Sequence, residues 1–390
     1  MSKASNKPNE AEVHKAIDLL INQLVGLTDK DQKYIYHLPD GRVLDTKSWD
    51  GWDWTHGVGL YGIWKCYELT GNPDLLKHIE DWFQNHFKKG STEKNINTMS
   101  VFLTLAYVYE ATGNRTYLPW LETWAEWAMR GLPRTEYGGM QHITYVKTND
   151  QQLWDDTLMM TALPLAKIGK LLGRPSYVEE ALRQMPILIQ YLFDNPTGLF
   201  FHGWKFERTE DGRVGHNFAD ARWARGNSWL TIVIPEILEL LEDDDSSPAL
   251  GALRSHLVNT LTAQCRALST LQDPSGLWRT LLDCPVSEGS YPEASATAGF
   301  AYGIMKARRK NLLPAQVGLG SVSRTYDQIA LDAMHAVLEN VSGDGELLQT
   351  SFGTGMGDTL QFYKDIPKTA MPYGQAMAIM ALAEFARGFY

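Results

Sequence analysis

Cysteine is scarce in this sequence of 390 residues. The chain has three cysteines, Cys66, Cys265 and Cys284, and none of them belongs to a Cys-x-x-Cys motif. An odd number of widely spaced cysteines is typical of free thiols in a reducing compartment, rather than of a disulfide framework or a zinc site. Residues 1–8 are polar and lack the apolar segment of a secretory signal. We therefore expect a cytoplasmic protein.

Long apolar runs and basic tracts are missing as well. No apolar run approaches the roughly 20 residues that a membrane-spanning helix needs. With 36 basic and 46 acidic residues the net charge is -10, and no Lys/Arg-rich run stands out. Because nucleic-acid binding depends on clustered basic side chains that neutralise phosphates, the sequence predicts neither a nucleic-acid partner nor a membrane partner.

The sequence also lacks the short motifs of several enzyme classes. Gly-x-Ser-x-Gly, His-x-x-x-His and His-Glu-x-x-His are absent, and no glycine-rich dinucleotide or phosphate loop stands out. The histidines in the predicted loops have spacings that fit no common metal site; they are His56, His142, His202 and His216. We expect a protein with no metal and no cofactor.

What the sequence does contain is an internal repeat. Residues 67–76 (Tyr-Glu-Leu-Thr-Gly-Asn-Pro-Asp-Leu-Leu) resemble residues 109–118 (Tyr-Glu-Ala-Thr-Gly-Asn-Arg-Thr-Tyr-Leu), and residues 170–178 are a weaker copy. Each copy lies between two apolar helical runs, and its glycine suits the left-handed position that ends a helix. Each copy therefore predicts the tight corner of a helical hairpin, and repeated hairpins form a solenoid or a closed ring.

A second repeat predicts the opposite set of corners. Residues 195–200 and 273–278 share an Asx-Pro-x-Gly turn followed by a short aromatic strand. These corners are long, aromatic and polar, so in a closed ring they would form one rim that carries a binding site. We predict an all-α fold, an (α/α)6 barrel of six helical hairpins. Residues 1–390 would form a single catalytic domain, in which residues 1–10 are a disordered tail.

Aromatic side chains are abundant in the predicted loops of this rim. The chain has 13 Trp, 17 Tyr and 13 Phe, and residues 49–56, 200–204 and 222–229 alternate aromatic with polar side chains. A sugar ring needs a flat apolar wall and hydrogen-bonding groups around its edge. The alternative is that these rings only fill the centre of a wide barrel. Three such clusters in loops favour a carbohydrate site.

Two adjacent acids, Asp155 and Asp156, follow Trp154 and precede an apolar helical run. One interpretation is a helix N-terminus stabilised by acids, and the other is a reactive carboxyl. Neighbouring helical residues diverge by about 100°, so we expect only one of the two acids to face a given spot. Shielding from water by Trp154 would raise the pKa of that acid, as a general acid requires. The residues alone leave the choice between the two acids open.

Three longer motifs carry a family resemblance. They are residues 154–160 (Trp-Asp-Asp-Thr-Leu-Met-Met), 198–204 (Gly-Leu-Phe-Phe-His-Gly-Trp) and 223–229 (Trp-Ala-Arg-Gly-Asn-Ser-Trp). Weaker matches are residues 54–58, 138–142 and 353–355. Over roughly residues 40 to 388 the sequence resembles glycoside hydrolase family 105, the unsaturated rhamnogalacturonyl hydrolases, which are related to the unsaturated glucuronyl hydrolases of family 88. The resemblance implies an (α/α)6 barrel, in agreement with the repeats.

The resemblance also implies the reaction. Substrates of the family are small oligosaccharides left by polysaccharide lyases, and they carry a 4-deoxy uronate with a C4=C5 double bond at the non-reducing end. By resemblance, Asp156 and not Asp155 is the acid, and it protonates C4. Water then adds at C5 while the same carboxylate takes its proton, and the hemiketal opens. One carboxyl does both jobs, so the two-carboxylate geometry of ordinary glycosidases is not required.

Other positions take roles from the same resemblance. Arg225 would hold the uronate carboxylate or the reacting ring, since its planar fork suits a carboxylate. His142 and His202 would contact the sugar, Trp54, Trp204 and Trp229 would form pocket walls, and Asp53 and His56 would lie at the entrance. Asn97 stands where many relatives have an acid. An amide there would bind a hydroxyl, and the missing charge should lower the pKa of Asp156. We expect a monomer or a homodimer.

Two other functions remain open at this point. One is a different glycan enzyme on the same barrel, either a sugar isomerase or an ordinary glycosidase in which Asp156 pairs with Asp220 or Glu293. The other is a glycan-binding protein without catalysis, which would show affinity but no turnover. Hydrolysis of saturated sugars would favour the ordinary glycosidase.

Overall fold

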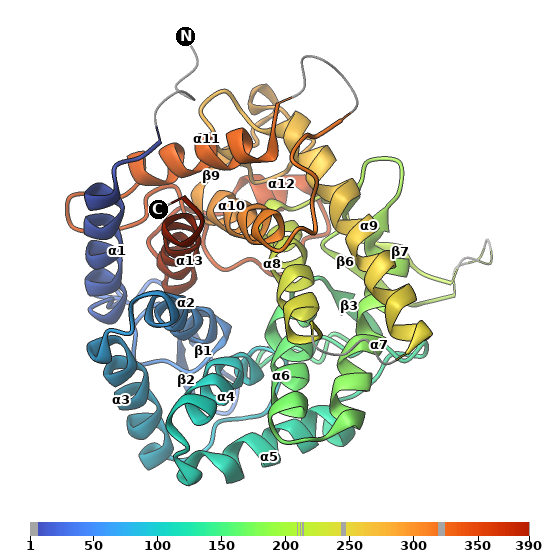
Figure 1. Cartoon of the computed structure of the whole chain (residues 1–390). Coiled ribbons are helices and arrows are strands. Elements are labelled where there is room, and N and C mark those ends of the chain that lie inside the picture. The colour runs from blue at the N-terminus through green and yellow to red at the C-terminus, as the bar shows by residue number, and fades with distance from the viewer. Residues whose placement is uncertain are drawn as a thin grey trace.

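The computed structural model describes residues 7–208, 210, 212, 214–242, 247–318 and 324–389. Its long helices form two concentric rings (Figure 1). The inner ring consists of α2 (Trp54–Thr70), α4 (Val101–Thr112), α6 (Leu163–Leu171), α8 (Ala224–Leu240), α10 (Ala294–Arg309) and α13 (Pro372–Phe389). The outer ring consists of α1 (Glu10–Val25), α3 (Pro73–Lys89), α5 (Leu118–Glu126), α7 (Pro175–Leu192), α9 (Pro248–Leu271) and α11 (Tyr326–Glu339). Each inner helix contacts the next, and α13 closes the ring against α2. The predicted (α/α)6 barrel is confirmed.

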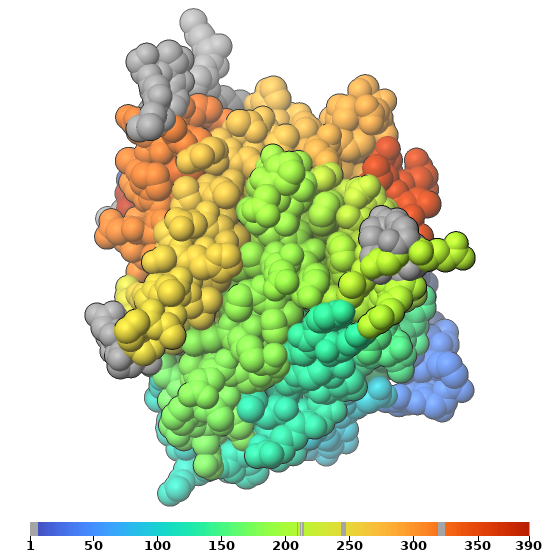
Figure 2. Space-filling model, turned by 90° about the vertical axis from the view of Figure 1, so that its right-hand side faces the viewer, coloured from blue at the N-terminus to red at the C-terminus, as the bar shows by residue number. Residues whose placement is uncertain are grey.

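Inner and outer helices differ in how they are buried. Residues 55–66 of α2 and 372–386 of α13 are buried on every side, whereas α3 is buried along one stripe only. A helix that is apolar all round belongs in the centre of a large core. Glycines let the inner helices approach closely: a Cβ atom at Gly62 would lie 2.7 Å from Cα of Ala376. In the outer ring, Figure 2 shows α7 (green) beside α9 (yellow).

One end of the barrel has the tight corners that the first repeat predicts. Gly71 and Gly113 end α2 and α4 in the left-handed conformation, each with φ 64°. Asn72 then caps α3, whose first residue is a proline. Gly173 takes φ 61° after α6, so the weaker copy also forms such a corner. The local turn chemistry therefore predicts these hairpins correctly.

The opposite end carries the short strands, all in antiparallel pairs. The strands are β1 (Ile35–His37), β2 (Val43–Asp45), β3 (Gln152–Trp154), β4 (Phe193–Asp194), β5 (Leu199–Phe200), β6 (Gly203–Lys205), β7 (His216–Asn217), β8 (Trp278–Arg279) and β9 (Pro292–Glu293). In the β3–β6–β7 sheet Trp154 lies opposite Gly203. The ladder continues beyond the strand, because the backbone N–H of Asp155 donates to the carbonyl of His202 at 3.0 Å. This pairing brings two of the sequence motifs together.

The smaller helical pieces lie in the connections. Residues Trp127–Gly131 and Leu158–Ala162 are π-helical turns, and Thr98–Ser100, Arg115–Tyr117 and Val286–Glu288 are 3-10 turns. Helix α12 (Leu360–Lys364) lies in the loop that precedes α13. None of the helices in the described part of the chain is long and apolar enough to cross a membrane. The expected tail falls mostly on residues 1–6, outside the described residues, and Glu10 already begins α1 with Asn9 as its cap.

Ion pairs occupy the barrel axis near the tight corners. Glu236 of α8 is buried and lies 2.7 Å from Nζ of Lys306 on α10 and 3.7 Å from Nζ of Lys65 on α2. The hydroxyl of Tyr302 also donates to Glu236. Burial raises the pKa of Glu236, but the two lysines outweigh it and hold the pKa at about 2. The axis is thus closed by a paired charge cluster at the end away from the strands.

Candidate active site

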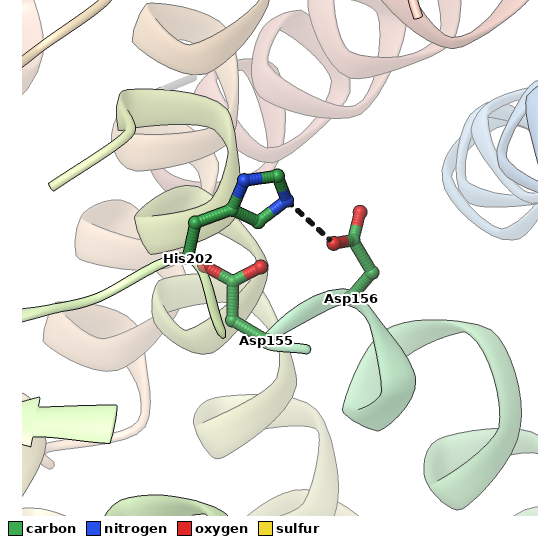
Figure 3. A group of neighbouring side chains, drawn as sticks. All are labelled: Asp155, Asp156 and His202. Atoms are coloured by element: carbon green, nitrogen blue, oxygen red, sulfur yellow. Dashed lines mark ion pairs between the residues drawn. The ribbon is translucent and has the colours of Figure 1, made fainter. Parts of the chain in front are cut away.

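Asp156 lies at the start of the helical stretch that runs through the π-helical turn Leu158–Ala162 into α6. Its Oδ1 accepts a hydrogen bond from Nε1 of Trp229 at 3.2 Å. Its Oδ2 lies 3.4 Å from Nε2 of His202, the contact drawn as a dashed line in Figure 3. The Asp156 side chain keeps 11% of its surface exposed, so it is shielded but not sealed. This is the arrangement expected of a reactive carboxyl in a low-dielectric pocket.

His202 is oriented by a residue far along the chain. Its Nδ1 lies 2.7 Å from the hydroxyl of Tyr363 in α12, and its ring packs against Trp223 at 4.4 Å between centroids. With Nδ1 engaged by Tyr363, Nε2 is directed at Asp156. Tyr363 was not predicted as a site residue, and no local pattern around it signals the contact.

His142 lies on the other side of the acid motif. Its ring stacks on Trp154 at 4.2 Å with an interplanar angle of 6°, and its Nδ1 lies 2.9 Å from the hydroxyl of Thr157. Burial lowers the pKa of His142 to about 4, against the opposing charge of Asp156. The imidazole is therefore neutral near pH 7. The structure thus brings together four predicted residues: Asp156, His142, His202 and Trp229.

The two adjacent acids are closer than we expected. Ligand atoms of Asp155, Asp156 and His202 all lie within 4.8 Å of one another. Asp155 precedes the helix, in a turn, so the helical divergence does not separate the two side chains. The expectation that only one acid faces this spot was wrong. Among the described residues this is the one group of acids and histidines close enough to share a cation, and the same closeness suits a shared proton.

The pKa shifts of Asp155 and Asp156 also differ from the prediction. Burial raises the pKa of Asp155 well above its usual range. Burial acts in the same direction on Asp156, but its contact with His202 and a hydrogen bond with Asp155 outweigh it. The pKa of Asp156 is held at about 2, so the predicted upward shift was wrong for Asp156. The two shifts thus run in opposite directions, upward for Asp155 and downward for Asp156.

A cavity of about 470 Å³ opens beside these residues on the strand-bearing rim. Asp53, Trp54, Asn97 and Trp154 line it, together with parts of the loops at residues 144–149 and 352–358. Trp54 stacks on Tyr373 at 4.5 Å and meets Trp229 edge-on at 6.2 Å between centroids. Since Trp229 bonds to Asp156, the acid lies directly behind the wall of the cavity.

Two of the polar residues that line the cavity, Asp53 and Asn97, were predicted to bind the substrate. Asp53 caps α2 by accepting the N–H of Trp54 at 2.9 Å, and burial raises its pKa to about 7. Asn97 precedes the 3-10 turn Thr98–Ser100, where its N–H donates to Asn95 and its carbonyl accepts from Ser100. Neither backbone bond uses the Asn97 side chain. Both residues are placed to meet polar groups of a ligand.

Two predicted site residues, His56 and Trp204, do not line the cavity. His56 is fully buried: its Nδ1 accepts the N–H of Asp53 at 3.2 Å and its Nε2 bonds to the carbonyl of Ser48 at 2.8 Å. Both ring nitrogens are used by backbone groups, and Nδ1 completes the capping box of α2, so the expected entrance role was wrong. Trp204 packs near Tyr191, 5.9 Å between centroids, and is not part of the cavity wall.

Arg225 is fully buried and is committed to other parts of the protein. Its guanidinium donates to the carbonyls of Ser351 and Phe352 at 3.0 and 3.1 Å and to the hydroxyl of Thr354 at 3.0 Å. It also lies 3.8 Å from Glu293. The expected direct grip on a uronate carboxylate is therefore not seen. Arg225 instead positions the 351–354 loop, whose residues 352–354 line the cavity.

The carboxylates proposed for an ordinary glycosidase pair are placed elsewhere. Glu293 accepts from the hydroxyl of Ser295 and from the N–H groups of Ala296 and Ser351, so it caps α10 and anchors the same loop. Asp220 lies on an exposed loop and accepts from Asn217 at 2.8 Å. Neither residue lines the cavity beside Asp156.

Comparisons with known proteins identify the family of the chain. Residues 28–389 match the model of Glycosyl Hydrolase Family 88. The unsaturated rhamnogalacturonyl hydrolase YesR of Bacillus subtilis is 31% identical over 360 residues, which cover 91% of this chain and 95% of YesR.

Several solved structures are similar to this chain, two of them in both sequence and fold. A possible member of family GH105 from Salmonella enterica is 55% identical with a TM-score of 0.91, covering 99% of this chain and 96% of that one. A similar protein from Klebsiella pneumoniae is 53% identical with a TM-score of 0.89, covering 100% and 97%. The unsaturated glucuronyl hydrolase of Bacillus sp. GL1 shares the fold at 17% identity and a TM-score of 0.67, covering 95% of each chain.

Proposed function

Because the chain belongs to Glycosyl Hydrolase Family 88, in the branch of the family 105 unsaturated rhamnogalacturonyl hydrolases, we propose that it releases a 4-deoxy, C4=C5-unsaturated uronate from the non-reducing end of small oligosaccharides made by polysaccharide lyases. The observation that carries this proposal is Asp156, held between Trp229 and His202 behind the wall of a sugar-sized cavity. The matched relative YesR is an unsaturated rhamnogalacturonyl hydrolase.

The chemistry needs one acid that also acts as a base. Asp156 donates a proton to C4 of the enol ether, and positive charge develops at C5, where the ring oxygen stabilises it. Water adds at C5 and gives its proton to the Asp156 carboxylate. The resulting hemiketal opens at its C5–O5 bond, giving a ketone at C5 and a hemiacetal at C1. The hemiacetal then collapses to an aldehyde, which releases the remaining oligosaccharide as an alcohol and the uronate as a keto sugar. Overall one water is consumed and Asp156 returns to its starting state.

The surrounding residues take binding roles in this proposal. Trp54 and Trp154 offer flat walls to the apolar face of a sugar, while Asp53 and Asn97 meet its hydroxyls. Arg225 acts indirectly, through the loop that it anchors at the rim. Residues 1–390 act as one catalytic domain, which the family match over residues 28–389 supports.

We further propose that the enzyme works in the cytoplasm, as a monomer or a homodimer. The three cysteines are free and buried, which suits a reducing compartment.

The experiment is a screen of lyase digests of pectin, ulvan, gellan and glycosaminoglycans, followed by the ultraviolet absorbance of the C4=C5 bond. The wild type should bleach at least one digest and leave saturated sugars intact. Asp156→Asn should bind the same digest but lose about 10²–10⁴-fold in rate, whereas Asp220→Asn, on an exposed loop, should behave as the wild type. Bleaching by Asp156→Asn at the wild-type rate, or no bleaching of any digest, would overturn the proposal.

A further inference from the structure

The carboxyl of Asp155 is buried in an unusual way. It has no exposed surface, and neither of its oxygens has a hydrogen-bond donor among the described residues. It packs directly on the first turn of α8, since a Cβ atom at Gly226 would lie 2.1 Å from its Oδ2. Figure 3 shows Asp155 and Asp156 beside each other, with the ring of His202 next to both.

In the free enzyme, with no positive charge in the cavity to offset it, this environment disfavours a second negative charge. An ionised carboxylate that is removed from water and has no donor costs several kcal/mol, so the group stays neutral instead. A neutral carboxyl carries an O–H that needs an acceptor. Asp156 is that acceptor, because it is the neighbouring carboxylate and is already stabilised as an anion by Trp229 and His202. Oxygens of the two carboxyls lie within 4.8 Å of each other, and two acids brought together in a water-poor site favour the state in which one of them keeps a proton.

We propose that Asp155 is a positioning residue for the hydrolysis: it holds the shared proton in the free enzyme and passes it to Asp156 when an anionic substrate fills the cavity. This inference rests on the proposed function. It answers a difficulty in that function, because Asp156 on its own has donors that favour its ionised form and would lack the proton that C4 must receive.

The proton balance closes over one cycle. The pair begins with the proton on Asp155, and the proton moves to Asp156 as substrate binds. Asp156 then gives it to C4, which leaves two carboxylates facing the positive charge at C5. Water adds at C5 and returns a proton to Asp156, and this proton passes back to Asp155 when the products leave. The pair therefore carries one proton before and after turnover.

The charged and titratable groups around the pair come from four elements. They are His142 of the loop before β3, His202 after β5, Arg225 of α8 and Tyr363 of α12. Arg225 would favour an ionised Asp155, but its guanidinium is committed to Glu293 and to the 351–354 loop. His142 and His202 act on Asp156. No side chain among the described residues therefore donates a hydrogen bond to Asp155.

The first test needs no substrate. Infrared spectra of the full chain at pH 7 should contain the carbonyl stretch of a buried, protonated carboxyl that Asp155→Asn removes and Asp220→Asn retains. Burial raises the pKa of Asp53 to about 7, so this carboxyl can contribute a similar band; Asp53→Asn is recorded as well and should leave the Asp155 band in place. A spectrum that Asp155→Asn leaves unchanged would overturn the proposal, whether or not any digest is bleached.

The second test is the pH profile of kcat. An amide at position 155 donates a hydrogen bond to Asp156 and keeps it ionised, so Asp155→Asn should move the alkaline limb at least about one pH unit downward and reduce kcat at pH 7 about 10-fold or more. KM should change little. Asp155→Ser, a smaller side chain, serves if the amide variant does not fold. A wild-type profile in either folded variant would contradict the proposal.

Discussion

The hydroxyl of Tyr363 and Nδ1 of His202 lie 2.7 Å apart, although 161 residues separate them in the chain. Tyr363 belongs to the short helix α12, in the loop that precedes the last inner helix, and His202 follows β5 on the far side of the cavity rim. The contact fixes which nitrogen of His202 faces Asp156. It therefore links the late loop of the barrel to the protonation state of the acid.

We expect Tyr363→Phe to lower kcat about 3- to 10-fold, the effect of losing one buried hydrogen bond. KM should stay nearly constant, because Tyr363 lies behind His202 and not on the cavity wall. Steady-state kinetics on a bleached digest measures both constants. Tyr137→Phe is the matched control, since Tyr137 is exposed on another loop. A rise in KM with unchanged kcat would contradict the positioning role.

Trp229→Phe should shift the pH optimum upward. The substitution removes the N–H that donates to Oδ1 of Asp156 at 3.2 Å, so the ionised acid loses a stabilising donor and its pKa rises. The alkaline limb of kcat should therefore move to higher pH, opposite to the shift expected for Asp155→Asn. Trp120→Phe, in an outer-helix stack with Phe87, is the control. An alkaline limb that moves downward would show that Trp229 does not act through Asp156.

The fold could be predicted because its signals are local. Glycines at helix ends need a left-handed conformation, and Gly71 and Gly113 have it. The two kinds of corner indicated two rims, and the apolar runs between them indicated buried helices. These features depend on neighbouring residues only, so one sequence was enough to predict a ring of hairpins.

The site was predicted only where short motifs meet. The motifs around Asp156 and His202 are joined by the β3–β6 ladder, and their residues come together as expected. Arg225 was misjudged because its partners, Ser351 to Thr354, lie more than a hundred residues later and no local pattern reveals them. His56 had a usable signal: it stands three residues after Asp53, the spacing of a capping box.

His56→Ala should destabilise the protein and leave KM unchanged. The ring of His56 satisfies two backbone groups, the N–H of Asp53 and the carbonyl of Ser48, and losing these bonds costs about 1–3 kcal/mol. Urea unfolding measures the free energy of unfolding, and steady-state kinetics measures KM. A large rise in KM at unchanged stability would restore the binding role that the sequence suggested.

Arg225→Lys should weaken substrate binding through the 351–354 loop. A lysine cannot reproduce the planar set of donors that holds Ser351, Phe352 and Thr354. It also leaves buried Glu293 poorly paired, which costs about 3 kcal/mol of stability when a buried partner is lost. We expect KM to rise more than kcat falls. Arg183→Lys changes an exposed arginine and is the control. A wild-type KM for Arg225→Lys would mean that the 351–354 loop has no role in substrate binding.

The ion pairs on the barrel axis make stability depend on acid pH. Glu236 keeps a pKa of about 2 in the folded chain, below the value of 4.5 for an ordinary glutamate. The unfolded chain therefore binds more protons between these values, so the stabilisation is complete above about pH 4.5 and is lost as the pH falls towards 2. Glu236→Gln removes the buried acid that Lys306 and Lys65 share, although Lys306 still pairs with Glu239 and Lys65 with Glu68, so it should lower the free energy of unfolding by about 1–3 kcal/mol at pH 7. The difference in the free energy of unfolding between Glu236→Gln and the wild type should shrink at pH 3.

The control is Asp81→Asn, in an exposed pair with Lys77, which should cost less than about 1 kcal/mol of that free energy at either pH. Denaturant unfolding at the two pH values decides the matter, and an equal loss for Glu236→Gln at both would mean that the cluster contributes by packing and not by charge.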